Sequence, residues 1–239
     1  MVKKFEKAEW RRKIQGFLMK KVIFGIFSVI FVLLAGCNFN PGPDASPVAK
    51  GLAKLLPSGG KSPRQKIFDH CSSTDPDQRR KGVRMLGEGA APTWPGTPEI
   101  LNIMAKGDPD ALVRAAAVQT LAQIGKAGAN VDTLEKTSRD ESPLVRQETM
   151  RALKGVEEEP AGAILRERLA KDTDSTVRAL AAERLREHPG SPTSLALIEA
   201  VEDADHAVAF RARESLRALA SQDFGYNRQE WLTWLAEQK

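Results

Sequence analysis

A seven-residue motif, Asp-x-x-x-x-Val-Arg, recurs along this chain at a nearly fixed spacing and constrains its fold more than any other feature. Intact copies begin at Asp108, Asp140 and Asp172, and a degenerate copy begins at Asp203, with Ala209 in the Arg position. The intervals between copies are 32, 32 and 31 residues. A fixed period between about 20 and 50 residues is typical of solenoids, in which each unit buries its apolar face against its neighbours.

Each copy of the motif is followed by apolar or small residues at the spacing of one helical face. Counted from the motif Val, positions 0, +4, +8 and +11 hold Val113, Ala117, Leu121 and Ile124; Val145, Thr149, Leu153 and Val156; Val177, Ala181, Leu185 and His188; Val208, Ala212, Leu216 and Leu219. Two residues after each motif Asp stands a residue suited to cap a helix N-terminus. These predicted caps are Asp110, Ser142, Asp174 and Asp205.

A further helix is predicted ahead of each motif copy. The segments are Pro98–Ala105, Val131–Thr137, Ala161–Ala170 and Thr193–Val201. Their predicted core residues are Leu101, Met104, Leu134, Ile164, Leu165, Leu169, Leu195 and Ile198. The repeating unit is therefore a helix–turn–helix with the motif Asp in the turn, which predicts an all-α fold.

The motif, extended to Asp-x-x-x-x-Val-Arg-x-x-Ala-x-x-x-Leu, resembles the second helix of a HEAT repeat, of the short type also found in phycobilin lyases. The resemblance covers roughly residues 63–222 and implies an α-solenoid of about five HEAT-like helix pairs. It also implies a hydrogen-bonded Asp–Arg ladder between neighbouring repeats, interrupted at Ala209. The residues implied for this ladder are Asp108, Arg114, Asp140, Arg146, Asp172 and Arg178. One such scaffold hosts many functions, so the resemblance specifies fold rather than activity.

The segment ahead of the intact repeats is predicted to be a degenerate first repeat, Pro63–Gly89, with Asp77 as the cap of its second helix. Terminal repeats are commonly atypical because one of their faces meets water. A loop, Ala90–Thr97, follows. Trp94 in this loop is predicted either to pack over the first two repeats or to serve as an exposed contact residue.

The C-terminal segment, residues 223–239, is predicted to close the last repeat with a helix, Arg228–Gln238. Trp231, Trp234 and Leu235 share one face of that helix. The segment resembles the aromatic ending of some bacterial envelope HEAT-like proteins. An aromatic binding platform is the alternative interpretation, since exposed aromatic patches often mark interfaces.

Residues 1–36 are predicted to be an export signal. Lys20-Lys21 is followed by Val22–Ala35, which carries no charge and is too short to span a bilayer, for which about 20 residues are needed. The run ends in Leu-Ala-Gly before Cys37, which resembles the bacterial lipobox; in lipoproteins of that kind the Cys is diacylated and becomes the first mature residue. The alternative is an ordinary thiol after an uncleaved helix. Met1 and Met19 are both possible starts of translation.

The segment Asn38–Ser62, rich in Pro and Gly, is predicted to be a flexible tether after the acylated Cys37. Within it, Val48–Leu56 is predicted either to lie on the membrane surface or to form a turn packed on the first repeat. The basic character of the chain belongs to the signal, which holds eight Lys and Arg against two acids. The remainder has 28 basic and 29 acidic residues, so nucleic-acid binding is not expected.

The sequence offers no constellation typical of catalysis. His70, His188 and His206 lie in different repeats, and neither a metal-ligand spacing nor a phosphate loop or nucleophile elbow occurs. Cys71 is interpreted as a half-buried thiol, and the Glu- and Arg-rich runs as solvated helix faces. We therefore expect no enzyme activity and no cofactor or bound metal.

The sequence predicts a non-enzymatic scaffold, tethered to a bacterial membrane in the cell envelope, that binds a protein partner. A lyase- or chaperone-like protein acting on a client protein is one alternative. A purely structural spacer of the envelope is another.

Overall fold

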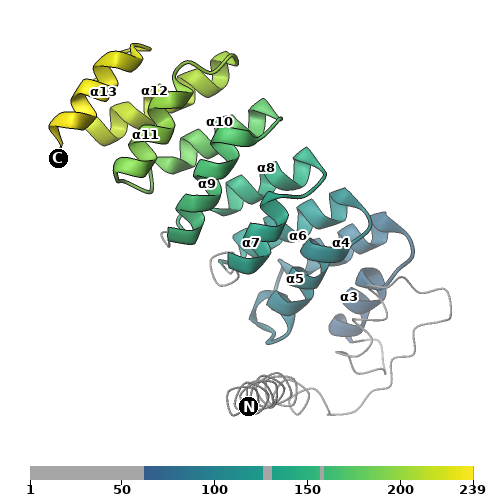
Figure 1. Ribbon diagram of the computed structural model, residues 1–239. Helices are drawn as coiled ribbons and strands as arrows, with labels where there is room; N and C mark the ends of the chain where they lie inside the picture. The colour runs from purple at the N-terminus through teal and green to yellow at the C-terminus, as the bar shows by residue number, and fades with distance from the viewer. Residues whose placement is uncertain (1–61, 126–130, 157–158, 239) are drawn as a thin grey trace, which may run out of the picture. The chain divides into compact units, whose positions relative to one another are not determined.

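The computed structural model of this chain describes residues 62–125, 131–156 and 159–238 (Figure 1). These residues form eleven α-helices and one short 3-10 turn, and no β-strand occurs among them. The predicted all-α fold class is confirmed. The predicted signal, Cys37 and the tether up to residue 61 lie outside the described residues.

The chain divides into two compact units at the boundary between Thr74 and Asp75. In the first unit the structure describes helix α3 (Pro63–Cys71), which has Ile67, Phe68 and Cys71 buried. The hydroxyl of Ser62 caps this helix by accepting a hydrogen bond from the Gln65 N–H at 3.2 Å. Ser62 therefore belongs to the start of the helix rather than to the predicted tether, and Cys71 is fully buried where partial burial was predicted.

The second unit is built from helix pairs in two layers (Figure 1). One layer contains the helices that carry the motif Arg positions: α4 (Pro76–Leu86), α6 (Ala111–Gln123), α8 (Pro143–Ala152), α10 (Ser175–Leu185) and α12 (His206–Ala220). The other contains the helices that precede the four motif copies, α5 (Thr97–Gly107), α7 (Val131–Ser138), α9 (Glu159–Lys171) and α11 (Ser191–Ala200), and the C-terminal helix α13 (Arg228–Glu237). Each helix packs on the next one of its own layer, so the unit is an α-solenoid. A short 3-10 turn, η1 (Ala91–Thr93), precedes α5.

The interior of this unit lies between the two layers and between successive repeats. The motif valines Val113, Val145, Val177 and Val208 are fully buried. The position four residues later is also fully buried and holds Ala in three repeats, which lets neighbouring helices approach closely. In α8 that position is Thr149, whose hydroxyl lies 2.9 Å from both the Val145 carbonyl and the Thr137 hydroxyl. The one polar member of this row is therefore hydrogen-bonded, as a buried hydroxyl requires.

Two further sequence predictions about individual residues are wrong. Leu195, predicted to be a core residue of α11, is 47% exposed. The inward face of that helix is instead completed by Thr193 and Ser194, whose small side chains are buried. The cap of α4 is Asp75 rather than Asp77, since the Asp75 carboxylate accepts from the Asp77 N–H at 2.9 Å.

Helix α13 packs on α11, in the place that the first helix of another repeat would take. Its Trp231 is fully buried, with the ring edge-to-face against Phe224 at 4.9 Å and Trp234 at 5.9 Å between centroids. The indole N–H of Trp231 donates to the Gly225 carbonyl at 2.9 Å. Burial of the central aromatic residue favours the interpretation of this helix as a cap over α11.

Candidate functional site

A ladder of arginine–carboxylate pairs connects the turns of successive repeats in the second unit. Each Arg donates through Nε and Nη2 to both oxygens of one Asp in the next repeat, at 2.8 to 2.9 Å. The four pairs are Arg79–Asp108, Arg114–Asp140, Arg146–Asp172 and Arg178–Asp203. Two parallel charge-assisted hydrogen bonds fix both distance and orientation, so each pair sets the register between two repeats.

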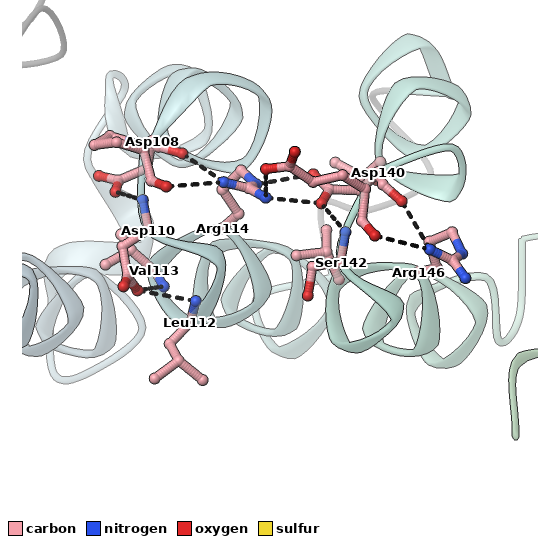
Figure 2. Close-up of polar contacts among 12 residues, drawn as sticks. Asp108, Asp110, Leu112, Val113, Arg114, Asp140, Ser142 and Arg146 are labelled. Atoms are coloured by element: carbon pink, nitrogen blue, oxygen red, sulfur yellow. Dashed lines mark hydrogen bonds and ion pairs between the residues drawn. The ribbon is translucent and has the colours of Figure 1, made fainter. Parts of the chain in front are cut away.

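Each motif Arg also binds the turn of its own repeat. Figure 2 shows Arg114 between the Asp108 carbonyl, to which Nη1 donates at 2.9 Å, and the Asp140 carboxylate of the next repeat. Arg146 donates in the same way to the Asp140 carbonyl at 2.9 Å. One guanidinium therefore joins two turns, which explains why the chain uses Arg here rather than Lys.

Each ladder Asp has a second function within its own turn. Its Oδ1 accepts the backbone N–H of the residue two positions later, at 2.8 to 3.0 Å. That later residue then begins the next helix. The Asp110 carboxylate accepts the Leu112 and Val113 N–H groups (Figure 2), and Asp174 and Asp205 cap their helices similarly. Ser142 takes the same position before α8 without a side-chain cap hydrogen bond.

The pairing shifts the pKa values of Arg114, Asp172 and Asp203 in the direction that favours the ion pair. The hydrogen bond to Asp140, opposed by burial, raises the pKa of Arg114. Burial raises the pKa of Asp172, but the hydrogen bonds from Arg146 and the Asp174 N–H outweigh it, and the net pKa is lowered. For Asp203 the hydrogen bond from Arg178 is the largest cause of a lowered pKa. Arg114, Asp172 and Asp203 are therefore charged at neutral pH.

The six residues implied by the HEAT resemblance all take part in this ladder, and the sequence reasoning missed two more. Arg79 supplies the first pair and Asp203 accepts the last. The chain has Ser73 six residues before Arg79, where the later repeats have Asp, and Ala209 where they have Arg. The neutral residues Ser73 and Ala209 thus take the places where a further Asp and a further Arg would have no ladder partner. All four guanidinium groups and all four carboxylates of the ladder are therefore paired with one another.

The outward faces of the second helices carry charges that are largely paired among themselves. On α8, Arg151 binds Glu148 at 2.7 Å. Between α10 and α12, Arg211 lies 3.6 Å from Glu183, and within α12 Arg217 binds Glu214 at 2.9 Å. Such exposed pairs contribute little to stability, but they leave these faces nearly neutral.

The ladder residues of the described ranges form structural hydrogen bonds between turns. Across the described ranges, no three His, Cys, Asp or Glu side chains gather as a metal site would require. His188 is buried against Gly162 of α9, with its Nε2 lacking a hydrogen-bond partner, and among the described residues it belongs to no such group of three. None of the described helices combines the length and apolar character needed to cross a bilayer.

Comparison with known proteins agrees with this architecture. Residues 97–186 match the family of HEAT repeats. The X-ray structure of YibA from Escherichia coli is similar, with 26% sequence identity and a TM-score of 0.56 over 66% of this chain. The match spans 60% of the length of that protein.

An engineered protein of known crystal structure also matches, with 19% identity and a TM-score of 0.48 over 72% of this chain and 83% of that one. Among curated proteins, none matches. The family match over residues 97–186 supports a HEAT-like repeat protein, and the ladder and the two-layer packing of stacked helix pairs continue on both sides of that segment, from α4 to α12.

Proposed function

We propose that this protein is a non-enzymatic scaffold that is anchored to a bacterial membrane through lipid on Cys37 and binds a partner protein in the cell envelope. One observation supports this most: the ladder holds α4, α6, α8, α10 and α12 in fixed register. Stacked repeats of this kind present extended surfaces on which other proteins dock. The lipobox-like sequence before Cys37 supports the anchor.

Two neighbouring second helices, α6 and α8, expose side chains at equivalent positions, which suits recognition across repeats. Gln119 of α6 and Arg151 of α8 are both exposed and lie 32 residues, one repeat, apart. Leu112 at the start of α6 and Phe210 of α12 are 47% and 45% exposed. Aromatic and aliphatic residues beside neutralised charges are typical of the central part of protein interfaces.

Site-specific cross-linking from intact membranes tests the binding function. A photo-reactive amino acid at position 119 or 151 samples the second helices, and the same substitution at Glu135 of α7 or Glu199 of α11, both exposed, samples the other layer. We expect one common adduct from positions 119 and 151 and none from 135 and 199. A chain that gives no discrete adduct from any of the four positions would be a spacer rather than a binding scaffold.

Mass spectrometry of the protein isolated from membranes tests the anchor. We expect a mature chain that begins at Cys37 and carries a diacylglyceryl group. The substitution Cys37→Ser should release the protein into the soluble fraction and abolish the adducts at positions 119 and 151. A chain that begins upstream of Cys37 without lipid would refute the anchor but leave the cross-linking result to decide the scaffold function.

A further inference from the structure

Positive charge is concentrated at the end of the chain nearest the proposed anchor. Residues 37–84 contain nine Lys and Arg against four Asp and Glu, a net charge of +5. Residues 85–239 contain 19 against 25, a net charge of −6. A charge asymmetry of this size within one chain indicates that its two parts face different surroundings.

Helix α4 gathers part of this positive charge on its outer face. Arg80, Lys81 and Arg84 fall within an arc of about 100° on an ideal helix. Arg79, about 100° to the other side of Arg80, is buried and reaches Asp108 in the ladder. The face away from the ladder therefore presents three basic side chains, of which Lys81 and Arg84 are exposed.

The pairing on α4 differs from that on the other second helices. Arg80 binds Asp77 at 2.7 Å, and this carboxylate is 71% exposed. Among the described residues, no carboxylate lies within ion-pair distance of Lys81 or Arg84. On α8, Arg151 occupies the position that Arg84 has on α4, and it is paired with Glu148. The face of α4 is thus a local excess of positive charge that its own repeat does not neutralise.

We infer that this face of α4 binds the anionic lipid headgroups of the membrane in which Cys37 is anchored. The inference rests on the proposed lipid anchor, which confines the face to the vicinity of that membrane. Residues 38–61 number twenty-four, and a chain of that length spans at most about 80 Å. Each Lys or Arg near an anionic membrane surface increases partitioning about fivefold. The acidic remainder of the array is repelled by the same surface and is left available to a partner.

Lysine labelling on vesicles tests the inference. The acylated full chain is reconstituted into vesicles of phosphatidylcholine alone, or with about a third phosphatidylglycerol to supply the negative surface potential. Lys81 is modified with a water-soluble acylating reagent, with the exposed Lys136 of α7 as internal reference. We expect the ratio of Lys81 to Lys136 labelling to fall about fivefold with phosphatidylglycerol, and to recover in high salt.

A matched pair of variants separates this face from basic charge in general. Arg80→Gln/Arg84→Gln keeps Lys81 as reporter and should abolish its protection. Arg151→Gln/Arg186→Gln removes the same charge from two exposed residues, one on α8 and one directly after α10, and should leave the protection unchanged.

Two results would overturn the inference: a Lys81 to Lys136 labelling ratio that is equal in both kinds of vesicle, or protection of Lys81 that persists in high salt. If mass spectrometry shows no lipid on Cys37, the proposed anchor is wrong, whatever the labelling shows. The same labelling of chain added to the outside of vesicles then still decides whether the α4 face binds anionic lipid.

Discussion

Replacing Arg146 with Ala should destabilise the array more than any surface arginine does. The substitution removes two hydrogen bonds to Asp172, at 2.8 and 2.9 Å, and one to the Asp140 carbonyl at 2.9 Å. It also leaves the Asp172 carboxylate, whose side chain is 1% exposed, without its main countercharge. Breaking one partner out of a buried pair costs about 3–5 kcal/mol. We expect about 3 kcal/mol, because Arg168 lies 3.5 Å from Asp172 and supplies part of the missing charge.

Thermal unfolding followed by circular dichroism measures this cost. For a unit of this size, each kcal/mol lowers the Tm by about 2–4 °C, which gives a decrease of about 6–12 °C. The control is Arg166→Ala, which removes an ion pair with the largely exposed Glu159 and should cost no more than about 1 kcal/mol. Because repeat arrays can unfold in parts, hydrogen exchange at the Asp174 N–H, which Asp172 holds at 3.0 Å, gives a local reading.

The double variant Arg146→Met/Asp172→Ala checks the cause of the loss. Replacing both members of a buried ion pair by apolar residues is often nearly neutral, so the double variant should regain part of the stability that Arg146→Ala loses. If Arg146→Ala and Arg166→Ala lowered the Tm equally and by less than about 1 °C, the ladder would not stabilise the array and the reasoning would be refuted.

Three further predictions concern acid stability, the C-terminal cap and the exposed core candidate. Folding lowers the pKa values of Asp172 and Asp203, so the ionised carboxylates stabilise the fold at any pH above the pKa of an unfolded Asp, about 3.9, and this stabilisation is lost as the pH falls through their pKa values in the folded state. The Tm should therefore be flat from about pH 7 to 5 and fall below about pH 4. A Tm that rises on acidification would contradict this. Trp231→Ala should cost about 3–5 kcal/mol and expose α11 amides to hydrogen exchange, whereas a platform role would leave exchange unchanged. Leu195→Glu, at an exposed position, should shift the Tm by less than about 2 °C. Ile198→Glu, at a fully buried position, should prevent stable folding. Comparable effects at the two sites would contradict the observed inward face of α11.

The period of the motif was sufficient to predict most helices of the second unit. In a stack of similar repeats, equivalent positions have the same surroundings, so the motif Val and the residue four positions later are buried in all four motif copies. The ladder was harder to predict at its first pair. Arg79 follows Gln78 rather than Val, and its Asp partner lies 29 residues later, whereas the next two pairs are separated by 26. The additional residues belong to the loop that contains η1. A motif search fails here because it requires the Val and the spacing, whereas the hydrogen bonds require only the guanidinium and the carboxylate.

Leu195 shows a different limit of the sequence pattern. Hydropathy favours Leu over Ser as the buried residue, yet Ser194 and Thr193 face inward and Leu195 faces outward. Since α11 packs against α9, α12 and α13, a small residue on its inner face permits closer approach than a Leu would. Helix periodicity therefore predicts that one face is buried, but the choice between adjacent positions depends on helix–helix distances that a single sequence does not contain.

The ladder also relates stability to the proposed binding function. Each Arg contacts the turn of its own repeat and the carboxylate of the next, so a change at one pair alters two turns at once. Gln119 and Arg151, which present the surface that we propose for a partner, lie on helices whose register the Arg114–Asp140 pair sets. A partner that contacts both helices binds only when that register is kept, because binding energy over several repeats depends on preorganised spacing. Weakening a buried pair should therefore reduce partner binding without changing any residue that the partner touches.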